Sequence, residues 1–165
     1  MSKFKKLSPR LRTVADLARG DILADIGSDH AYLPVWLVQN SKIKKAYAVD
    51  ISEKCVERIK KNLARFNIPH TVIMPVLSDG LSSFENIPDK PTDIVIAGMG
   101  GETIAEIING AGIEEYTDVH FILQPNTKKE KLKDFLSANN FKILREITVR
   151  EKRRVYTVIS AEIKM

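Results

Sequence analysis

With 165 residues, 44% of them hydrophobic and 28% charged, the chain has the composition of one globular domain over residues 1–165. No apolar stretch approaches the ~20 residues needed to cross a bilayer, and the basic start Met1–Lys6 precedes no secretory signal segment, so we expect a cytoplasmic protein without membrane contact. The single cysteine, Cys55, excludes an internal disulfide and a cysteine-based metal cluster and is expected in the core. A net charge of +5 permits a polyanionic partner without identifying one.

Hydrophobic periodicity and breaker residues divide the sequence into alternating helices and strands. Ser8 and Ser52 stand where side chains cap helix starts, and Thr127 with Glu130 has the spacing of a capping box. Pro75 interrupts one strand, which is therefore expected at a sheet edge. The predicted elements are, in chain order, a helix over 9–19, a strand over 21–26, a helix over 32–39, a strand over 45–50, a helix over 53–66, a strand over 70–76, a strand over 93–97, a helix over 102–109, a strand over 120–124, a helix over 128–138, and a hairpin of strands over 141–149 and 155–161. This alternation predicts an α/β fold, with a mostly parallel sheet covered on both faces and a C-terminal antiparallel hairpin.

Small and polar residues follow several of the predicted strands. Gly27 can adopt backbone angles closed to other residues, so a turn there can hold a nucleotide, although an ordinary turn is the alternative. Asp50 ends the second strand at the twenty-odd-residue distance at which a carboxylate reaches ribose hydroxyls. Asp79 lies in a polar turn after the third strand, and Gly98 begins a glycine-rich turn after the fourth. Because ligands of such sheets bind beyond the strand C-termini, these residues and Gln124 are expected to converge on one site.

Four segments of the sequence resemble one methyltransferase family. They are Leu7–Leu11, Ala24–Pro34, Ile96–Gly101 and Ile122–Pro125. The chain is similar over nearly its whole length to class I S-adenosylmethionine-dependent methyltransferases, and more narrowly resembles the bacterial tRNA adenine N1-methyltransferases that act at position 22. The runs Gly-Ser-Asp-His-Ala-Tyr-Leu-Pro and Ala-Gly-Met-Gly-Gly are quite specific as a pair, whereas Asp50 is common in nucleotide-binding sheets. The resemblance implies a Rossmann-like sheet of seven strands that ends in an antiparallel hairpin.

The resemblance also implies S-adenosylmethionine as the cofactor, tRNA as the partner and no metal ion, and we expect a monomer. The general methyltransferase loop has glycines where Asp29 and Ala31 stand, but the narrower family shares this feature, so cofactor binding is still expected. The predicted cofactor-binding residues are Asp25, Gly27, Ser28, Asp50, Ile51, Asp79, Gly80, Ala97, Gly98, Met99 and Gly100. Members of the narrower family continue into a helical C-terminal extension expected to help bind tRNA. This sequence ends at Met165, which we interpret as a core without that extension or as reduced tRNA contacts.

Three residues of the first turn are predicted to be catalytic. Adenine N1 has a lone pair and attacks a methyl group in line without a strong base, but the product ring is cationic. A carboxylate at Asp29 is therefore expected to stabilise that charge or to help remove a proton. His30 is expected to hydrogen-bond the cofactor or the base, with a loop histidine paired to backbone as the alternative. Tyr32 is expected to orient a ligand, with core packing as the alternative.

Other functions remain open from the sequence. They are a class I methyltransferase with a different RNA or small-molecule substrate, a nicotinamide-dependent oxidoreductase, and a non-catalytic basic RNA-binding module. Asp50 suits a nicotinamide cofactor as well, but the residues after Gly27 lack the full Gly-x-Gly-x-x-Gly spacing. If tRNA is the partner, two basic clusters are candidates for binding it, namely Lys60, Lys61 and Arg65, and the run Arg150–Arg154 with its four cations. The sequence does not decide between these clusters, and both can be solvated faces.

Overall fold

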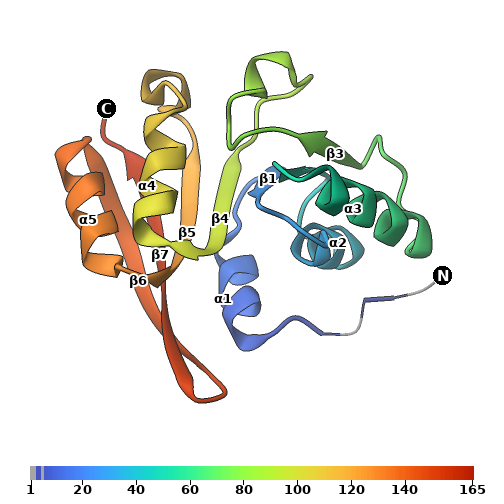
Figure 1. The fold of residues 1–165 in the computed structure, drawn as a ribbon, viewed down its shortest axis with the longest axis horizontal. Coiled ribbons are helices and arrows are strands. Elements are labelled where there is room, and N and C mark those ends of the chain that lie inside the picture. The colour runs from blue at the N-terminus through green and yellow to red at the C-terminus, as the bar shows by residue number, and fades with distance from the viewer. Residues whose placement is uncertain (1–2, 5) are drawn as a thin grey trace.

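The fold is built on one seven-stranded sheet (Figure 1). The computed structural model describes residues 3–4 and 6–165, so Met1, Ser2 and Lys5 of the basic start lie outside the described residues. The sheet order is β3-β2-β1-β4-β5-β7-β6, in which the first five strands are parallel and β7 runs antiparallel to both neighbours. The strands are β1 (Ile22–Ile26), β2 (Lys45–Asp50), β3 (Ile73–Leu77), β4 (Asp93–Gly100), β5 (His120–Thr127), β6 (Phe141–Glu151) and β7 (Arg154–Ile163). The predicted α/β class, with its parallel sheet and final hairpin, is confirmed.

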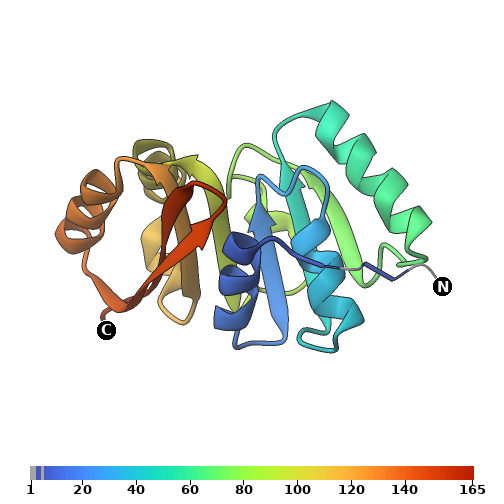
Figure 2. The ribbon, with the colours of Figure 1, turned by 90° about the horizontal axis from the view of Figure 1, so that it is seen from below.

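Helices cover both faces of the sheet because buried strands need an apolar cover on each side. One core cluster joins α1, α2 and α3 to the sheet, and a second joins α4, α5 and two short 3-10 helices to the opposite face. Figure 2 shows α1 beside α2, with α5 at the far end of the molecule next to β6. The helices are α1 (Pro9–Leu17), α2 (Tyr32–Gln39), α3 (Glu53–Arg65), α4 (Gly101–Asn109) and α5 (Lys129–Ala138), with 3-10 turns at Phe84–Asn86 and Ile113–Tyr116. Within the described part of the chain, no helix has the length and apolarity needed to span a bilayer.

Local signals explain most of the element boundaries. The Ser8 hydroxyl accepts a hydrogen bond from the Leu11 backbone N–H (3.3 Å), and Ser52 caps α3 in the same way, as predicted. Pro75 lies in β3 at the sheet edge, where its missing N–H leaves no ladder bond unmade. The strand starts at Ile73, three residues later than predicted.

Two predictions about the later strands and one about the cysteine were wrong. Thr127 does not cap a helix, because β5 continues through it and Lys128 takes the N-cap position in a left-handed conformation without a side-chain hydrogen bond. The strand β4 continues through Gly100, where a loop was expected, because bulges keep residues 99–100 paired with β5. Cys55 is only half-buried, because it lies in the first turn of α3 at the edge of the core.

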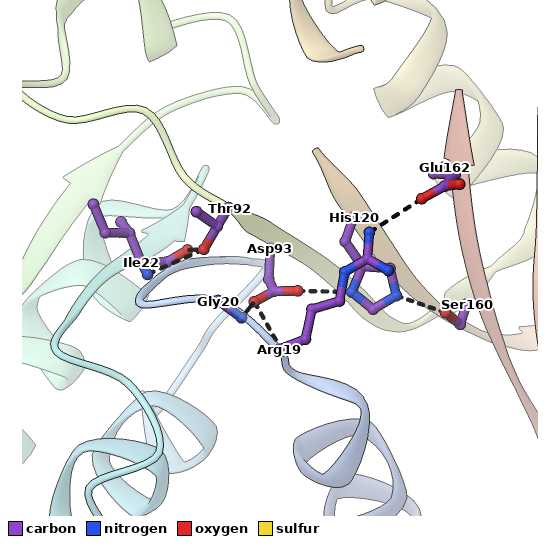
Figure 3. Close-up of polar contacts among 8 residues, drawn as sticks. All are labelled: Arg19, Gly20, Ile22, Thr92, Asp93, His120, Ser160 and Glu162. Atoms are coloured by element: carbon purple, nitrogen blue, oxygen red, sulfur yellow. Dashed lines mark hydrogen bonds and ion pairs between the residues drawn. The ribbon is translucent and has the colours of Figure 1, made fainter. Parts of the chain in front are cut away.

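A buried polar cluster ties the first helix to the sheet (Figure 3). The Asp93 carboxylate lies 2.7 Å from His120 Nδ1 and accepts the backbone N–H groups of Arg19 and Gly20, while His120 Nε2 lies 2.6 Å from the Ser160 hydroxyl. Asp93, His120 and Ser160 are all buried, so these mutual contacts replace the water that they lose on folding. The three residue types match those of a hydrolase triad. Asp93 and His120, however, begin β4 and β5, and Ser160 lies in β7 opposite Ile122, so the cluster is far from the carboxyl ends of the parallel strands. We therefore assign the three residues a structural role.

Candidate active site

A cavity of about 600 Å³ opens where β1, β2, β3 and β4 end. This volume lies within the ~300–1,000 Å³ range of small-molecule sites, and the position is the one expected for ligands of parallel sheets. Six of the predicted cofactor-binding residues line it: Gly27, Asp50, Ile51, Asp79, Gly80 and Met99. The remaining predicted residues do not line the cavity. They are Asp25 in β1, Ser28 in the turn after β1, and Ala97, Gly98 and Gly100 in β4.

The turn after β1 brings the backbone close to the end of β4. Gly27 has φ = +73°, and the backbone N–H groups of Gly27 and Ser28 both donate to the Val49 carbonyl (2.8 and 2.9 Å). A Cβ added at Gly27 would stand 2.3 Å from Met99 Cε, so a side chain would both strain the backbone and push Met99 aside. The glycine therefore lets the Met99 side chain pack against this turn, and both residues line the cavity.

Asp25 is a buried carboxyl beneath that turn. Its Oδ2 accepts a hydrogen bond from the Ser28 hydroxyl (2.8 Å), and its side chain does not reach the cavity wall. The pKa of Asp25 is raised from 3.8 to about 7, mainly by burial and also by the neighbouring Asp50 charge, against the lowering effect of the Ser28 hydrogen bond. The group is thus poised to change protonation near neutral pH.

Asp50 faces the cavity as an acceptor. Its Oδ2 accepts the Asp29 backbone N–H and its Oδ1 accepts the Ser52 backbone N–H, both at 3.1 Å. Each carboxylate oxygen has a further lone pair, so the fixed side chain can still accept hydroxyl groups of a ligand. The structure places Asp50 in the cavity wall, and its role toward ribose hydroxyl groups stays a prediction.

The three predicted catalytic residues lie together beside the cavity without lining it. Asp29, in a left-handed conformation, is paired with the Arg58 guanidinium of α3, and its other oxygen lies 3.4 Å from His30 Nε2. The His30 ring stacks on Tyr32, with centroids 4.8 Å apart and planes 9° apart. Tyr32 also packs against Phe4, so it has the packing contact expected from the alternative interpretation.

The last residues of β4 are held by a buried amide. Gly98 has φ = +80°, and its N–H donates to Gln124 Oε1 at 3.0 Å. The Arg10 guanidinium donates to the same oxygen at 2.6 Å, and the fully buried Gln124 amide donates to Asn126 Oδ1 at 3.1 Å. Gln124 therefore joins the end of β4 to α1. It lies at the strand ends as predicted, but it is fully buried and does not line the cavity.

Several residues of the candidate site were not predicted from the sequence. Arg58 and Arg10 contact predicted residues from 29 and 114 positions away, so only the folded chain shows the pairs. The stripe of α4 that faces the cavity is visible as helical spacing, but it gives no signal for ligand contact. The missed lining residues are Ile26, Ser78, Leu81, Ser82, Thr103, Glu106, Ile107 and Gly110. In the part of the chain that the structure describes, no group of three or more His, Cys, Asp or Glu side chains is placed to hold a metal ion.

The sheet order, its antiparallel last strand and the cavity at the strand ends define an α/β protein of the class I methyltransferase type. Residues 7–159 match the methyltransferase domain family, and the chain belongs to that family. The resemblance seen in the sequence is thereby confirmed. The chain is 35% identical over 159 residues to the tRNA (adenine(22)-N(1))-methyltransferase of Bacillus subtilis, with 95% of this chain and 65% of that protein covered. The chain thus spans slightly less than two thirds of that relative.

Solved structures agree with this relationship. A putative tRNA (m1A22) methyltransferase of Streptococcus pneumoniae in complex with S-adenosyl-L-methionine has a TM-score of 0.89 and 36% identity, covering 97% of this chain and 74% of that chain. TrmK of M. capricolum in complex with S-adenosyl-homocysteine has a TM-score of 0.84 and 34% identity, covering 94% of this chain and 68% of that chain.

Proposed function

We propose that this chain transfers a methyl group from S-adenosylmethionine to N1 of adenine 22 in tRNA. The observation that carries the proposal is the position of the cavity, whose lining residues run from Ile26 to Gly110 and so lie wholly within the segment that matches the methyltransferase domain family. The activity named for the B. subtilis relative and the cofactor bound in the S. pneumoniae structure support the choice of substrate and cofactor.

The cavity residues fit this cofactor. Gly27 lines the cavity at the end of β1, and the fixed Asp50 carboxylate is suited to accept ribose hydroxyl groups. Ile51 follows β2, Gly80 lies in the turn after β3, and both line the cavity, where the flat adenine of the cofactor can pack. When bound, S-adenosylmethionine supplies a methyl group made electrophilic by its sulfonium.

The chain supplies mainly position and charge to the reaction. Asp29 is the carboxylate proposed to stabilise the adenine ring as it becomes cationic. Its pairing with Arg58 and His30 fixes the carboxylate in direction while leaving the side chain about half exposed, at 48%. Because adenine N1 is occupied in a paired or stacked base, the target must leave its stack, at a cost of a few kcal/mol that tRNA contacts recover.

Ligand-dependent thermal stability separates this function from its rivals. S-adenosylhomocysteine at about 100 times its dissociation constant is expected to stabilise the fold by roughly 2.7 kcal/mol, which corresponds to about 5–10 °C for a chain of this size. NAD at the same concentration is the matched control and is expected to give no shift. A shift with NAD would favour the oxidoreductase, and no shift with either ligand would favour a non-catalytic RNA-binding module.

The remaining expectations follow from the proposed substrate. A tRNA-modifying enzyme of bacterial type acts in the cytoplasm, which agrees with the location predicted from the sequence. The monomer stays a prediction, and light scattering at enzyme concentrations used for activity tests it directly.

A further inference from the structure

The β6–β7 hairpin extends past the rest of the sheet. The strand β5 pairs with β7 only from His120↔Glu162 to Leu123↔Ile159, whereas β6 continues to pair with β7 as far as Glu151↔Arg154. Five residue pairs, from Ile147↔Val158 onward, therefore have no β5 partner and reach roughly 15 Å further at ~3.4 Å per residue. Since β7 runs antiparallel to β5, this extension projects at the carboxyl end of β5, the edge that holds the candidate site. Figure 1 shows it as the red loop that projects beyond the other elements.

One face of the extension is anchored to the first helix. Ile147 and Val149 pack against the core cluster that contains α1. The Glu151 carboxylate accepts the Arg10 backbone N–H at 3.1 Å and lies 3.8 Å from Arg10 Nε. An isolated two-stranded hairpin is marginally stable in water, so these contacts fix its direction.

The tip of the hairpin carries cations that have no ion pair. Arg150, Lys152, Arg153 and Arg154 are all exposed, and among the described residues no carboxylate lies within 4.0 Å of their charged groups. The lysines at the start of α5 differ, because Lys128 and Lys131 pair with Glu102, and Lys129 and Lys133 with Glu146. The hairpin tip is therefore available to an external anion.

The turn of the hairpin carries a lysine at a position where a residue that tolerates a left-handed backbone would be more stable. Lys152 occupies a two-residue turn with φ = +54°, a position where Gly, Asn and Asp are preferred because they tolerate a left-handed backbone. A lysine at such a position strains the backbone without making an intramolecular ion pair. A strained residue at an exposed tip is a reason to look for a ligand.

A chain of contacts joins the hairpin to the candidate site. The Arg10 guanidinium lies 5.6 Å from the centroid of the Tyr156 ring and donates to Gln124 Oε1, which also accepts the Gly98 N–H. A polyanion that lies along the hairpin would thus continue toward the turn after β4.

We propose that the hairpin tip, Arg150 to Arg154, binds the phosphate backbone of the tRNA whose adenine enters the site. This inference rests on the proposed function and decides between the two basic clusters of the sequence. The α3 cluster is the weaker candidate, because Lys60 pairs with Glu57 and is therefore less available to an external anion. The Tyr156 ring, which lies in β7 next to the tip, is covered by Arg10, so the tip is suited to backbone contacts that are independent of base sequence.

The test compares two triple variants that remove the same charge at different places. Arg150→Gln, Lys152→Gln and Arg153→Gln remove three positive charges from the tip, and Lys54→Gln, Lys61→Gln and Arg65→Gln remove three exposed or half-exposed charges from α3. Affinity for unmodified tRNA is measured over a range of salt concentrations, together with the melting temperature and the dissociation constant for S-adenosylhomocysteine. The tip variant is expected to bind tRNA at least about tenfold more weakly and to lower the salt dependence by roughly one phosphate contact per charge, whereas the α3 variant is expected to change affinity less than about threefold. Both variants are expected to keep the melting temperature and the cofactor affinity.

Each other result has a definite meaning. Equal losses of tRNA affinity in the two triple variants, or no loss in the tip variant, would overturn the inference. The proposed function would still hold if the unchanged protein methylates tRNA. If the unchanged protein methylates no tRNA, the proposed function itself fails. Binding of the tip to vesicles of phosphatidylserine and phosphatidylcholine, without loss of tRNA affinity in the tip variant, would assign the surface to a membrane and also overturn the inference.

Discussion

Replacement of Asp25 by Asn should change how stability depends on pH. A rise of the pKa of Asp25 from 3.8 in the unfolded chain to about 7 in the folded protein corresponds to roughly 4 kcal/mol at about 1.4 kcal/mol per pKa unit. Below the unfolded value both states are protonated, and this cost is absent. As the pH rises toward 7 the unfolded state loses its proton first, so the folded state loses stability until its own carboxyl ionises.

The size of the effect follows from these two pKa values. Between about pH 5.5 and pH 8 the Asp25 contribution is expected to destabilise the protein by roughly 2 kcal/mol. The Asp25→Asn variant cannot ionise and keeps an acceptor for the Ser28 hydroxyl, so its stability relative to the unchanged protein should rise by that amount over this interval. Urea unfolding of both proteins at the two pH values measures the difference in their free energies of unfolding. Contributions of other titrating groups cancel in that difference.

Asp118→Asn is the matched control, because Asp118 is exposed and lies in the loop before β5. Its relative stability is expected to vary by less than about 0.5 kcal/mol between the two pH values. The reasoning would be refuted if Asp25→Asn and Asp118→Asn showed the same pH dependence, or if the Asp25→Asn variant lost relative stability as the pH rose.

Three further substitutions test the site and its support. Asp50→Ala should weaken S-adenosylmethionine binding about 10- to 100-fold in calorimetry, because a charge-assisted hydrogen bond is worth roughly 1.5–3 kcal/mol. Asp29→Asn keeps the size but removes the charge, and should lower kcat for tRNA by at least about tenfold while the cofactor dissociation constant changes less than about threefold. Gly101→Ala would place a Cβ 2.3 Å from the Lys128 carbonyl oxygen and should cost about 1–3 kcal/mol of stability in urea unfolding.

Each of these substitutions has an informative control. Asp50→Asn retains an acceptor for the backbone N–H groups, so a loss of affinity in this variant isolates the charge. Unchanged affinity in Asp50→Ala would remove Asp50 from the cofactor site. Equal losses of kcat and cofactor affinity in Asp29→Asn would assign Asp29 to binding. Gly110→Ala brings a Cβ no closer than 3.4 Å to a neighbour and should be nearly neutral, and a cost like that of Gly101→Ala would contradict the packing argument.

The sequence predicted well those features that depend on local pattern. Alternating apolar runs located the strands, and Pro75 placed β3 at the edge because a proline cannot complete a central ladder. The capping box at Thr127 was wrong because pairing with β4 extends β5 through that residue, and this long-range ladder outweighs the local signal.

The residues of the candidate site also differ in whether a local sequence pattern predicts them. Gly27 and Asp50 could be predicted because each follows a strand directly, and parallel strands end at a common edge. The partners that hold the predicted residues could not be predicted, because Arg58 reaches Asp29 only when α3 packs against β2 and β3, and Arg10 reaches Gln124 only when α1 packs beside β5. These pairs depend on side-chain direction in the assembled fold and have no sequence spacing of their own.

Position-specific methylation of tRNA tests the central claim most directly. An unmodified transcript with adenine at position 22 and a matched transcript with guanine there are incubated with the protein and labelled S-adenosylmethionine, and nuclease digests are analysed by mass spectrometry. The account predicts one N1-methyladenosine per tRNA, at position 22 of the first transcript, and no label in the second. Equal label in both transcripts, or a methyl group on another base, on a protein or on a small molecule, would contradict it.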